Sequence, residues 1–334
     1  HFVRRRQRQM CIRDRIKILQ EVLTPRQLVS VQASLYDPLG FLAPFMLMAR
    51  RMLQIAMKES GGWDSPLAEW LRNEFKKWAA SIPQLASLRI RRWWNIPSTE
   101  GSTQDELHLF SDASAIGYAA VAYRRVTGED GSTHVTILTA RSHVVPINAA
   151  RASHHGSIPR LELTAADKAT ELRQFIETSM MRTFPRTVMW TDSQCVLKQI
   201  FDKTTNFKAF FANRLSKIHA ATSNDEWRYV DSKNNPADHA SRGIQAHEKE
   251  KWDVFHNGPQ FLKKIEEYWP EMPIPRNNSP SAVEEFISIA AVRTSINTAS
   301  ERIDDVILTA ISKVGRWHLK VRRVMTILKA IRHW

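Results

Sequence analysis

Apolar residues follow a helical period in the first part of the chain. Between residues 16 and about 97 they recur at spacings of three and four, which predicts amphipathic helices interrupted at "DPLG" and at Pro44. A further helix is predicted over "SPLAEWLRNEFKKWAASI", with Ser65 as its N-cap, Pro66 at its first position and Pro83 beyond its end. We therefore expect an α-helical segment over residues 16–100.

The apolar period changes to two after residue 105. Three strand-like runs follow, "LHLFSD", "IGYAAVAYRRV" and "HVTILTARSHV", and the turn-rich "TGEDGST" joins the last two into a hairpin. A long helix opened by Pro159, the strand "TVMWTD", the helices "SQCVLKQIF" and "FKAFFANRLSKIHAATS", and the strand "EWRYV" come before "DSKNNPADHASRG". This β-β-β-α-β-α-β-α order predicts an α/β fold, in which one side of a mixed sheet is an antiparallel meander and the other has right-handed parallel crossovers.

The two ends of the chain differ from this central region. Residues 246–300 read as a tail and linker, and residues 301–334 as a helix with an acidic start and a basic end, which either binds phosphates or faces solvent. Residues 1–15 carry six arginines and one aspartate without apolar periodicity. They are either a basic arm for RNA or a translated cloning adaptor; we favour the adaptor and expect no part of the fold from these residues.

Charge and composition narrow the function classes. The formal net charge is +14, and +9 without the first fifteen residues, which favours nucleic acid as partner over an anionic membrane surface. Two cysteines exclude a disulfide framework and a Cys-rich zinc knuckle, so we expect an intracellular protein that is not secreted. No apolar run approaches the roughly 20 residues that cross a bilayer, so no membrane partner is expected.

Four acidic residues lie where this topology brings segments together. They end the first and fourth strands and begin the long helix and the last helix: Asp112, Asp192, Glu162 and Asp238. Packed carboxylates repel each other unless cations hold them, and hard oxygen ligands suit Mg²⁺ or Mn²⁺. Each acid also has an ordinary interpretation, as a helix cap or a dipole partner. A shared site is favoured because "FSD" and "WTD" both end a strand in Asp before a small residue.

The order of several segments carries a resemblance to a known family. These are "LYDPLGFLAPFMLMAR", "LHLFSDASAIGYAAVAY", "IPRLELTAA", "WTDSQCVLKQI", "FFANRLSKI", "WRYV", "NNPADHASRG" and "GPQFL". Over residues 16 to about 262 the chain resembles the polyprotein of Pao-type (BEL/Pao) long-terminal-repeat retrotransposons. The resemblance implies a reverse-transcriptase thumb or connection segment over 16–100 and a ribonuclease H-like domain with a five-stranded sheet over 105–245. The helix of 301–334 would lead toward integrase.

The resemblance also implies an activity and its residues. The domain would hydrolyse the RNA strand of RNA/DNA hybrids during reverse transcription, with two Mg²⁺ (or Mn²⁺) ions bound by Asp112, Glu162, Asp192 and Asp238. Ser114, Ser193, Asn213 and Arg242 would contact substrate or serve as caps and surface residues. The implied partners are the hybrid and the reverse transcriptase and integrase parts of the polyprotein, in a cytoplasmic particle and the nucleus.

Departures from the family and competing functions are also visible. The loop "VDSKNNPAD" lacks the histidine that many ribonucleases H carry before the last aspartate, and His239 follows Asp238 instead. His154 and His155 lack the third ligand of a zinc site. Neither a "YxDD" polymerase motif nor the Asp-Thr/Ser-Gly of aspartic peptidases occurs. The competing hypotheses are a catalytically inactive nucleic-acid-binding or structural remnant, and a nuclease of this fold that cuts DNA.

Overall fold

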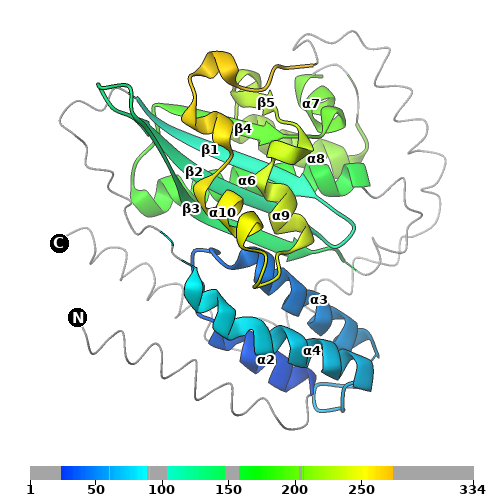
Figure 1. The fold of residues 1–334 in the computed structure, drawn as a ribbon. Helices are drawn as coiled ribbons and strands as arrows, with labels where there is room; N and C mark the ends of the chain where they lie inside the picture. The colour runs from blue at the N-terminus through cyan, green and yellow to red at the C-terminus, as the bar shows by residue number, and fades with distance from the viewer. Residues whose placement is uncertain are drawn as a thin grey trace.

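A five-stranded mixed sheet forms the centre of the fold (Figure 1). The structure is a computed structural model that describes residues 24–59, 61–88, 90, 104–146, 158–202, 205 and 207–273. The strands are β1 (Gln104–Ala113), β2 (Gly117–Thr127), β3 (Thr133–Val144), β4 (Arg186–Thr191) and β5 (Trp227–Tyr229), in the order β3-β2-β1-β4-β5. The first three strands are antiparallel, whereas β4 is parallel to β1 and to β5. The predicted mixed sheet, with its meander and parallel crossovers, is confirmed.

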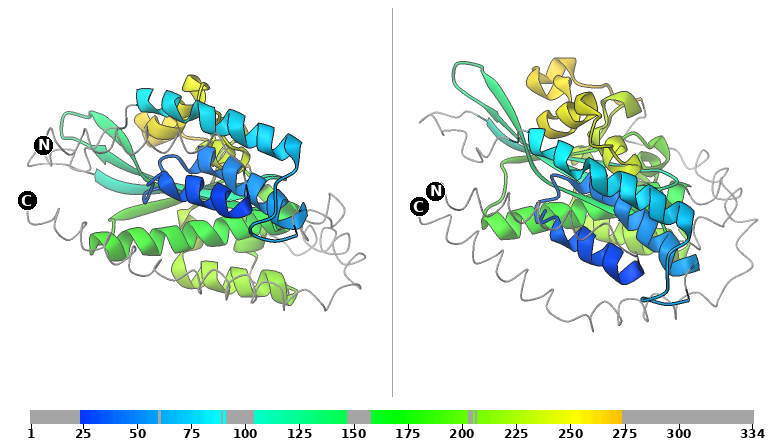
Figure 2. Two further views of the ribbon diagram at one scale, coloured as in Figure 1. Left: turned by 90° about the horizontal axis from the view of Figure 1, so that it is seen from below. Right: turned by 60° about the horizontal axis from the view of Figure 1, so that its bottom comes forward.

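Helices cover both faces of the sheet, and the alternation of apolar residues along each strand supplies both cores. Leu107 and Leu109 of β1 pack against one set of helices: α6 (Ile158–Met180), α7 (Gln194–Phe201) and α8 (Ala209–Ala221). Phe110, one position further along β1, lies in the core of the opposite face. Figure 2 shows the sheet edge-on, with α6 and α8 on one side and the N-terminal helices on the other.

The N-terminal helices share the second core. They are α2 (Pro25–Ser34), α3 (Ala43–Glu59) and α4 (Glu69–Ser81), followed by the 3₁₀ helix η2 (Ile82–Ser87). Phe45 and Phe75 are fully buried in one cluster with Phe110 and Val121 of the sheet. The described part of the predicted helical segment therefore packs onto the strands through a continuous apolar interior.

The predicted start of the helix near residue 65 is wrong. The structure begins α4 at Glu69 with Ala68 as N-cap, while the amide of Ser65 donates to the carbonyl of Gly62 in a turn. Leu67 is only 4% exposed, and its burial in the core holds this stretch in an extended path. The predicted interruption at Pro44 is also wrong. Pro44 is the second residue of α3, in the first turn, where a backbone amide has no partner within the helix and proline is tolerated.

A close approach of two backbones anchors the turn before α3 to the sheet. The carbonyl of Leu39 accepts hydrogen bonds from the Ala140 amide (2.9 Å) and from the Thr139 hydroxyl (2.8 Å). Gly40 has a φ of +72°, and a Cβ there would lie 1.8 Å from the Ala140 carbonyl oxygen. The "DPLG" segment therefore requires glycine, because a side chain would push the N-terminal helices off β3.

The segment after residue 245 also packs on the sheet. It contains α10 (Lys249–Asn257) and the 3₁₀ helices η5 (Gln260–Lys263) and η6 (Glu266–Tyr268). The Tyr123 hydroxyl donates to the Phe255 carbonyl at 2.6 Å, and Arg125 Nε donates to the Leu262 carbonyl at 2.8 Å. Arg125 is itself buried and paired with buried Glu106 at 2.6 Å. Residues 246–273, expected as the start of a tail, thus complete the second core.

The structure does not test the predictions made for the two ends of the chain. The described residues leave out 1–23, 91–103 and 274–334. The adaptor-like segment, both ends of the predicted helical segment of 16–100, the rest of the predicted linker and the helix of 301–334 therefore lie outside them. The predicted domain boundaries stay predictions. Within the described ranges, no helix has both the length and the apolar character to cross a membrane.

Candidate active site

Two of the predicted acids meet at one edge of the sheet. Strands β1 and β4 run parallel, and their last register pair joins Ser111 to Thr191. Asp112 and Asp192 each follow one residue later, so both carboxylates emerge at the same strand ends. The sequence therefore places them together through parallel pairing alone, because carboxyl ends of neighbouring parallel strands share an edge.

The third acid reaches this edge from α6. The helix begins at Ile158, one residue before Pro159, so Glu162 is its fifth residue. The Ser193 hydroxyl donates to Glu162 Oε2 at 2.7 Å and accepts from the Val196 amide at 3.2 Å as the N-cap of α7. Burial raises the pKa of Glu162, and the negative charge of Asp192 raises it further. Ser193 thus joins the start of α7 to the acid on α6.

The fourth acid lies on the short helix α9 (Pro236–Arg242). Asn235 is the N-cap, since its side chain accepts a hydrogen bond from the Ala237 amide at 3.1 Å, and Pro236 occupies the first helical position. Asp238 is the third residue of α9, and its Oδ1 accepts from Arg242 Nε at 2.5 Å, one helical turn later. The predicted helix start at Asp238 is therefore correct to within two residues.

The carboxylates interact electrostatically. Burial, and next the charge of Asp192, raise the pKa of Asp112 from an ordinary 3.8 to about 7, and Asp238 adds to the rise. Burial and the charge of Asp238 likewise raise the pKa of Asp192. Arg242 lies close enough to feel the charge of all three aspartates. Asp238 raises the pKa of its guanidinium most, and Asp112 and Asp192 also raise it. Like charges held this close favour protons or cations.

Hydroxyl groups hold the carboxylates in this arrangement. Ser241 is completely buried and donates to Asp112 Oδ2, while Ser232 donates to Asp192 Oδ2 at 2.6 Å. These residues, and Asn235 beside them, were not singled out from the sequence. A signal for them existed, because Ser232, Asn235, Asp238 and Ser241 recur every third residue in "DSKNNPADHASR".

The four predicted substrate residues have different surroundings. Ser114 is buried and donates to the Ser241 carbonyl at 2.8 Å, and its hydroxyl accepts from the Gly117 amide, so it stabilises the turn after β1. Ser193 caps α7, and Arg242 pairs with Asp238. Asn213 is exposed on α8. Ser114 therefore has an internal role in the structure, while substrate contact by these residues stays a prediction.

The histidines near the site are partly buried. Burial lowers the pKa of His239, which follows Asp238 on α9. His143 stacks on Tyr118 with ring centroids 5.1 Å apart, and burial, followed by the charge of Arg50, lowers its pKa to about 4. His154 and His155 lie outside the described residues.

The donor set has the chemistry of a divalent-cation site. The candidate ligands are all carboxylate oxygens, which Mg²⁺ and Mn²⁺ prefer: those of Asp112, Glu162, Asp192 and Asp238. A bound cation would offset the repulsion between these negative charges. In the described ranges, however, no three Asp, Glu, His or Cys side chains are arranged so that they could hold a metal ion as they stand. Cation binding therefore requires these carboxylates to move from the positions that they occupy here.

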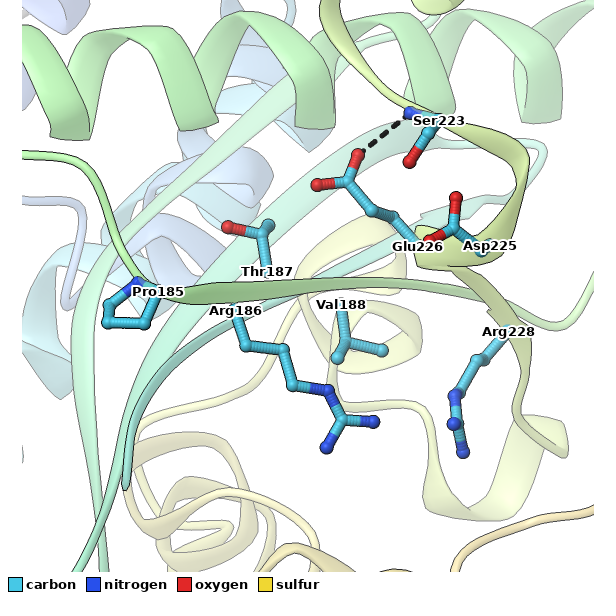
Figure 3. Close-up of a pocket in the computed structure, with 8 residues that line it drawn as sticks. All are labelled: Pro185, Arg186, Thr187, Val188, Ser223, Asp225, Glu226 and Arg228. Carbon is cyan, nitrogen blue, oxygen red and sulfur yellow. Dashed lines mark hydrogen bonds between the residues drawn. The ribbon is translucent and has the colours of Figure 1, made fainter. Parts of the chain in front are cut away.

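A separate polar pocket lies at the opposite end of β4 (Figure 3). Its lining includes Arg186, Thr187 and Arg228, and Figure 3 shows the two arginines on one side of the strand and Thr187 on the other. Both arginines pair with Glu266, and each lies over the Trp269 ring at 5.4 Å. The positive groups of this pocket are thus committed to contacts within the chain.

Comparisons with known proteins identify the family. A family model described as a Pao retrotransposon-like RNaseH-like domain matches residues 24–193, more than half of the chain. A search of curated proteins finds no match. Similar solved structures include the N-terminal RNase H domain of a Mycobacterium tuberculosis protein, fused to maltose binding protein, which is 13% identical with a TM-score of 0.26 and covers 45% of this chain and 96% of that chain.

Two further solved structures are similar at the same level. RNase H1 from Halobacterium salinarum NRC-1 is 13% identical with a TM-score of 0.24, over 40% of this chain and 89% of that chain. LC11-RNase H1 in complex with an RNA/DNA hybrid is 12% identical with a TM-score of 0.24, over 40% of this chain and 91% of that chain. Likeness at this level adds no argument to the family match, which covers the N-terminal helices and the sheet as far as Ser193. The chain belongs to the family of Pao retrotransposon-like RNaseH-like domains.

Proposed function

We propose that this chain is a metal-dependent endonuclease that hydrolyses the RNA strand of RNA/DNA hybrids during retrotransposon reverse transcription. The observation that carries the proposal is the meeting of Asp112, Asp192 and Asp238 at the carboxyl ends of β1 and β4, where burial and mutual repulsion raise the pKa of Asp112 to about 7. Carboxylates collected in this way suit a site that binds cations next to a phosphodiester.

The chain's own residues divide the work in this proposal. Asp112, Glu162, Asp192 and Asp238 would hold two Mg²⁺ or Mn²⁺ ions. Such ions, when bound, activate a water and stabilise the leaving oxygen of a phosphodiester. Ser193 and Ser232 keep Glu162 and Asp192 in place before the ions arrive. The exposed guanidinium of Arg242 is free to turn from Asp238 toward a substrate phosphate, because its side chain is 62% exposed.

A basic and aromatic surface between α6 and α8 supports a nucleic-acid partner. The guanidinium of Arg160 on α6 lies 5.1 Å from the centre of the Phe210 ring on α8, and that of Arg214 lies 3.7 Å from the same ring. Arginine can bind backbone phosphates, and aromatic rings can stack on bases. Together with the net charge of +14, this surface favours RNA/DNA hybrid over an uncharged substrate. Within the same proposal, the chain works with the reverse transcriptase and integrase parts of its polyprotein inside the cell.

Cleavage of a labelled hybrid tests the proposal. The full chain is incubated with Mg²⁺ and a hybrid labelled in its RNA strand, beside Asp192→Asn and the control Asp253→Asn, whose carboxylate is exposed on α10. We expect wild type and the control to cut the RNA and Asp192→Asn to lose at least about 100-fold in rate, because a cation ligand is removed.

Two results would contradict parts of the proposal. A wild-type chain that is folded and binds the hybrid but does not cut it would favour the inactive nucleic-acid-binding remnant. Cleavage unchanged by Asp192→Asn would leave the activity but overturn the site. The whole chain is used because the N-terminal helices share a core with the sheet.

A further inference from the structure

The segment after β5 places a regular row of polar side chains against the acidic site. Ser232, Asn235, Asp238 and Ser241 are spaced by three residues, through the 3₁₀ helix η4 (Ser232–Asn234) and into α9. Asn235 has an extended backbone, with φ −90° and ψ 103°, between the two helices. Contacts, and not one helical face, bring the row to the carboxyl ends of β1 and β4: Ser232 bonds Asp192, Asn235 bonds the Ser111 carbonyl, and Ser241 bonds Asp112.

Asn235 is the residue of this row with the most contacts to the site. Its amide nitrogen donates to the carbonyl of Ser111, the residue before Asp112, at 3.1 Å. Its side chain is also close enough to the Asp192 carboxylate to lower the pKa of that acid, against the larger effect of burial. Its amide oxygen accepts from the Ala237 amide and caps the helix that carries Asp238. An asparagine amide offers two donor hydrogens and one acceptor oxygen, so one side chain can make all these bonds.

The surroundings of Asn235 make these bonds costly to lose. The residue is only 2% exposed, so water cannot replace a missing partner without rearrangement. Its neighbours in the row act on one acid each, with Ser232 donating to Asp192 and Ser241 donating to Asp112. Asn235 alone in the row joins the end of β1, the end of β4 and the start of α9.

We propose that Asn235 is a positioning residue that sets the ends of β1 and β4 and the start of α9 relative to one another, so that Asp112, Asp192 and Asp238 take up a divalent cation together. This inference rests on the proposed function. Groups that orient metal ligands without touching the metal commonly change metal affinity by about 10- to 100-fold when removed.

The competing interpretation is that Asn235 only caps α9. Serine is as good an N-cap as asparagine but is too short to bond the Ser111 carbonyl and reach Asp192 as well. Asn235→Ser therefore keeps the cap and removes the positioning bonds. The adjacent Asn234 is a matched control, because it is exposed and its side chain donates to Asp231 at 2.8 Å.

Calorimetric titration of the metal-free full chain with Mg²⁺ tests the inference without relying on activity. We expect Asn235→Ser to weaken Mg²⁺ binding by about tenfold or more and Asn234→Ser to leave it unchanged. The Mg²⁺ concentration for half-maximal cleavage should rise by the same factor, with much of the rate restored at saturation. Circular dichroism establishes that both variants are folded.

The outcomes separate this inference from the proposed function. Wild-type Mg²⁺ affinity in a folded Asn235→Ser chain overturns the positioning role and leaves the nuclease proposal intact. A wild-type chain that binds no Mg²⁺ overturns the proposed function and the inference with it. Should Asn235→Ser fail to fold, Ser232→Ala replaces it, because Ser232 is exposed and donates only to Asp192 among the acids. The same inference then predicts a rise of a few-fold in the Mg²⁺ dissociation constant, and no rise overturns it.

Discussion

Replacing Asp112 by asparagine should abolish cleavage and at the same time stabilise the metal-free protein. The pKa of Asp112 is raised to about 7 by burial and by the charges of Asp192 and Asp238. A carboxyl group whose pKa is higher in the folded state holds its proton more tightly there than in the unfolded chain. Wild-type stability therefore falls as the pH rises from about 4, near the ordinary pKa, to about 7. Asparagine has the same shape and does not titrate.

The size of the effect follows from the shift. A rise from 3.8 to about 7 is roughly three pKa units, or about 4 kcal/mol in the free energy of unfolding at pH 8. Part of this belongs to Asp192, because the two acids titrate together. The amide also exchanges the charge-assisted bond from Ser241 for a neutral one, which costs about 1 kcal/mol. We expect a net gain of about 2 kcal/mol at pH 8, with almost none at pH 4.

Urea unfolding in EDTA at several pH values between 4 and 8 measures this difference. Asp253→Asn, an exposed replacement of the same type on α10, is the control and should stay within about 0.5 kcal/mol of wild type. Saturating Mg²⁺ should stabilise wild type and reduce the advantage of Asp112→Asn, because the cation binds the folded carboxylates. A difference that does not change with pH, or an Asp112→Asn chain less stable than wild type at pH 8, would show that the folded protein does not raise the pKa of Asp112.

Three further predictions concern packing, a buried ion pair and hybrid binding. Phe75→Ala should lower the free energy of unfolding by about 3 to 5 kcal/mol in a single transition, because Phe75 lies in the core shared with the sheet; a separate, early transition would mean that the N-terminal helices unfold alone. Glu106→Gln should cost about 3 to 5 kcal/mol at pH 7 by leaving its buried arginine partner unpaired. Burial would raise the pKa of Glu106, but His108 and Arg125 lower it to about 2. The cost of Glu106→Gln should therefore shrink as the pH falls from about 4.5 toward 2, and it should stay constant above about 4.5. The pair Arg160→Gln and Arg214→Gln should weaken hybrid binding and reduce its salt dependence by one to two ions, about one for each lost phosphate contact; an unchanged salt slope in a filter-binding titration would exclude this surface.

The sheet and the strand-end acids were predictable because both depend on local pattern. Alternating apolar residues set the strands, and the buried run ending at Thr191 implies a strand parallel to β1. Once that pairing is assumed, Asp112 and Asp192 must share an edge. The order of the strands and one assumed pairing were therefore sufficient to place these two acids together.

The remaining features depend on contacts between distant segments. The start of α4 is decided by burial of Leu67 rather than by the cap signal at Ser65, and tertiary packing routinely overrides such local signals. The packing of α10 on the sheet depends on a bond between Tyr123 and Phe255, 132 positions apart in the sequence. Ser232 and Ser241, which bond Asp192 and Asp112, were missed because serine before and within a short helix ordinarily indicates a cap.

Strand selectivity is the most direct test of the central claim. The folded full chain is incubated with Mg²⁺ and three substrates: a hybrid labelled in its RNA strand, the same hybrid labelled in its DNA strand, and duplex DNA of the same sequence. We expect cleavage of the RNA strand alone, with 3′-hydroxyl and 5′-phosphate ends and no cleavage in EDTA. Cutting of duplex DNA, or intact RNA in a hybrid that the folded chain demonstrably binds, would contradict this expectation.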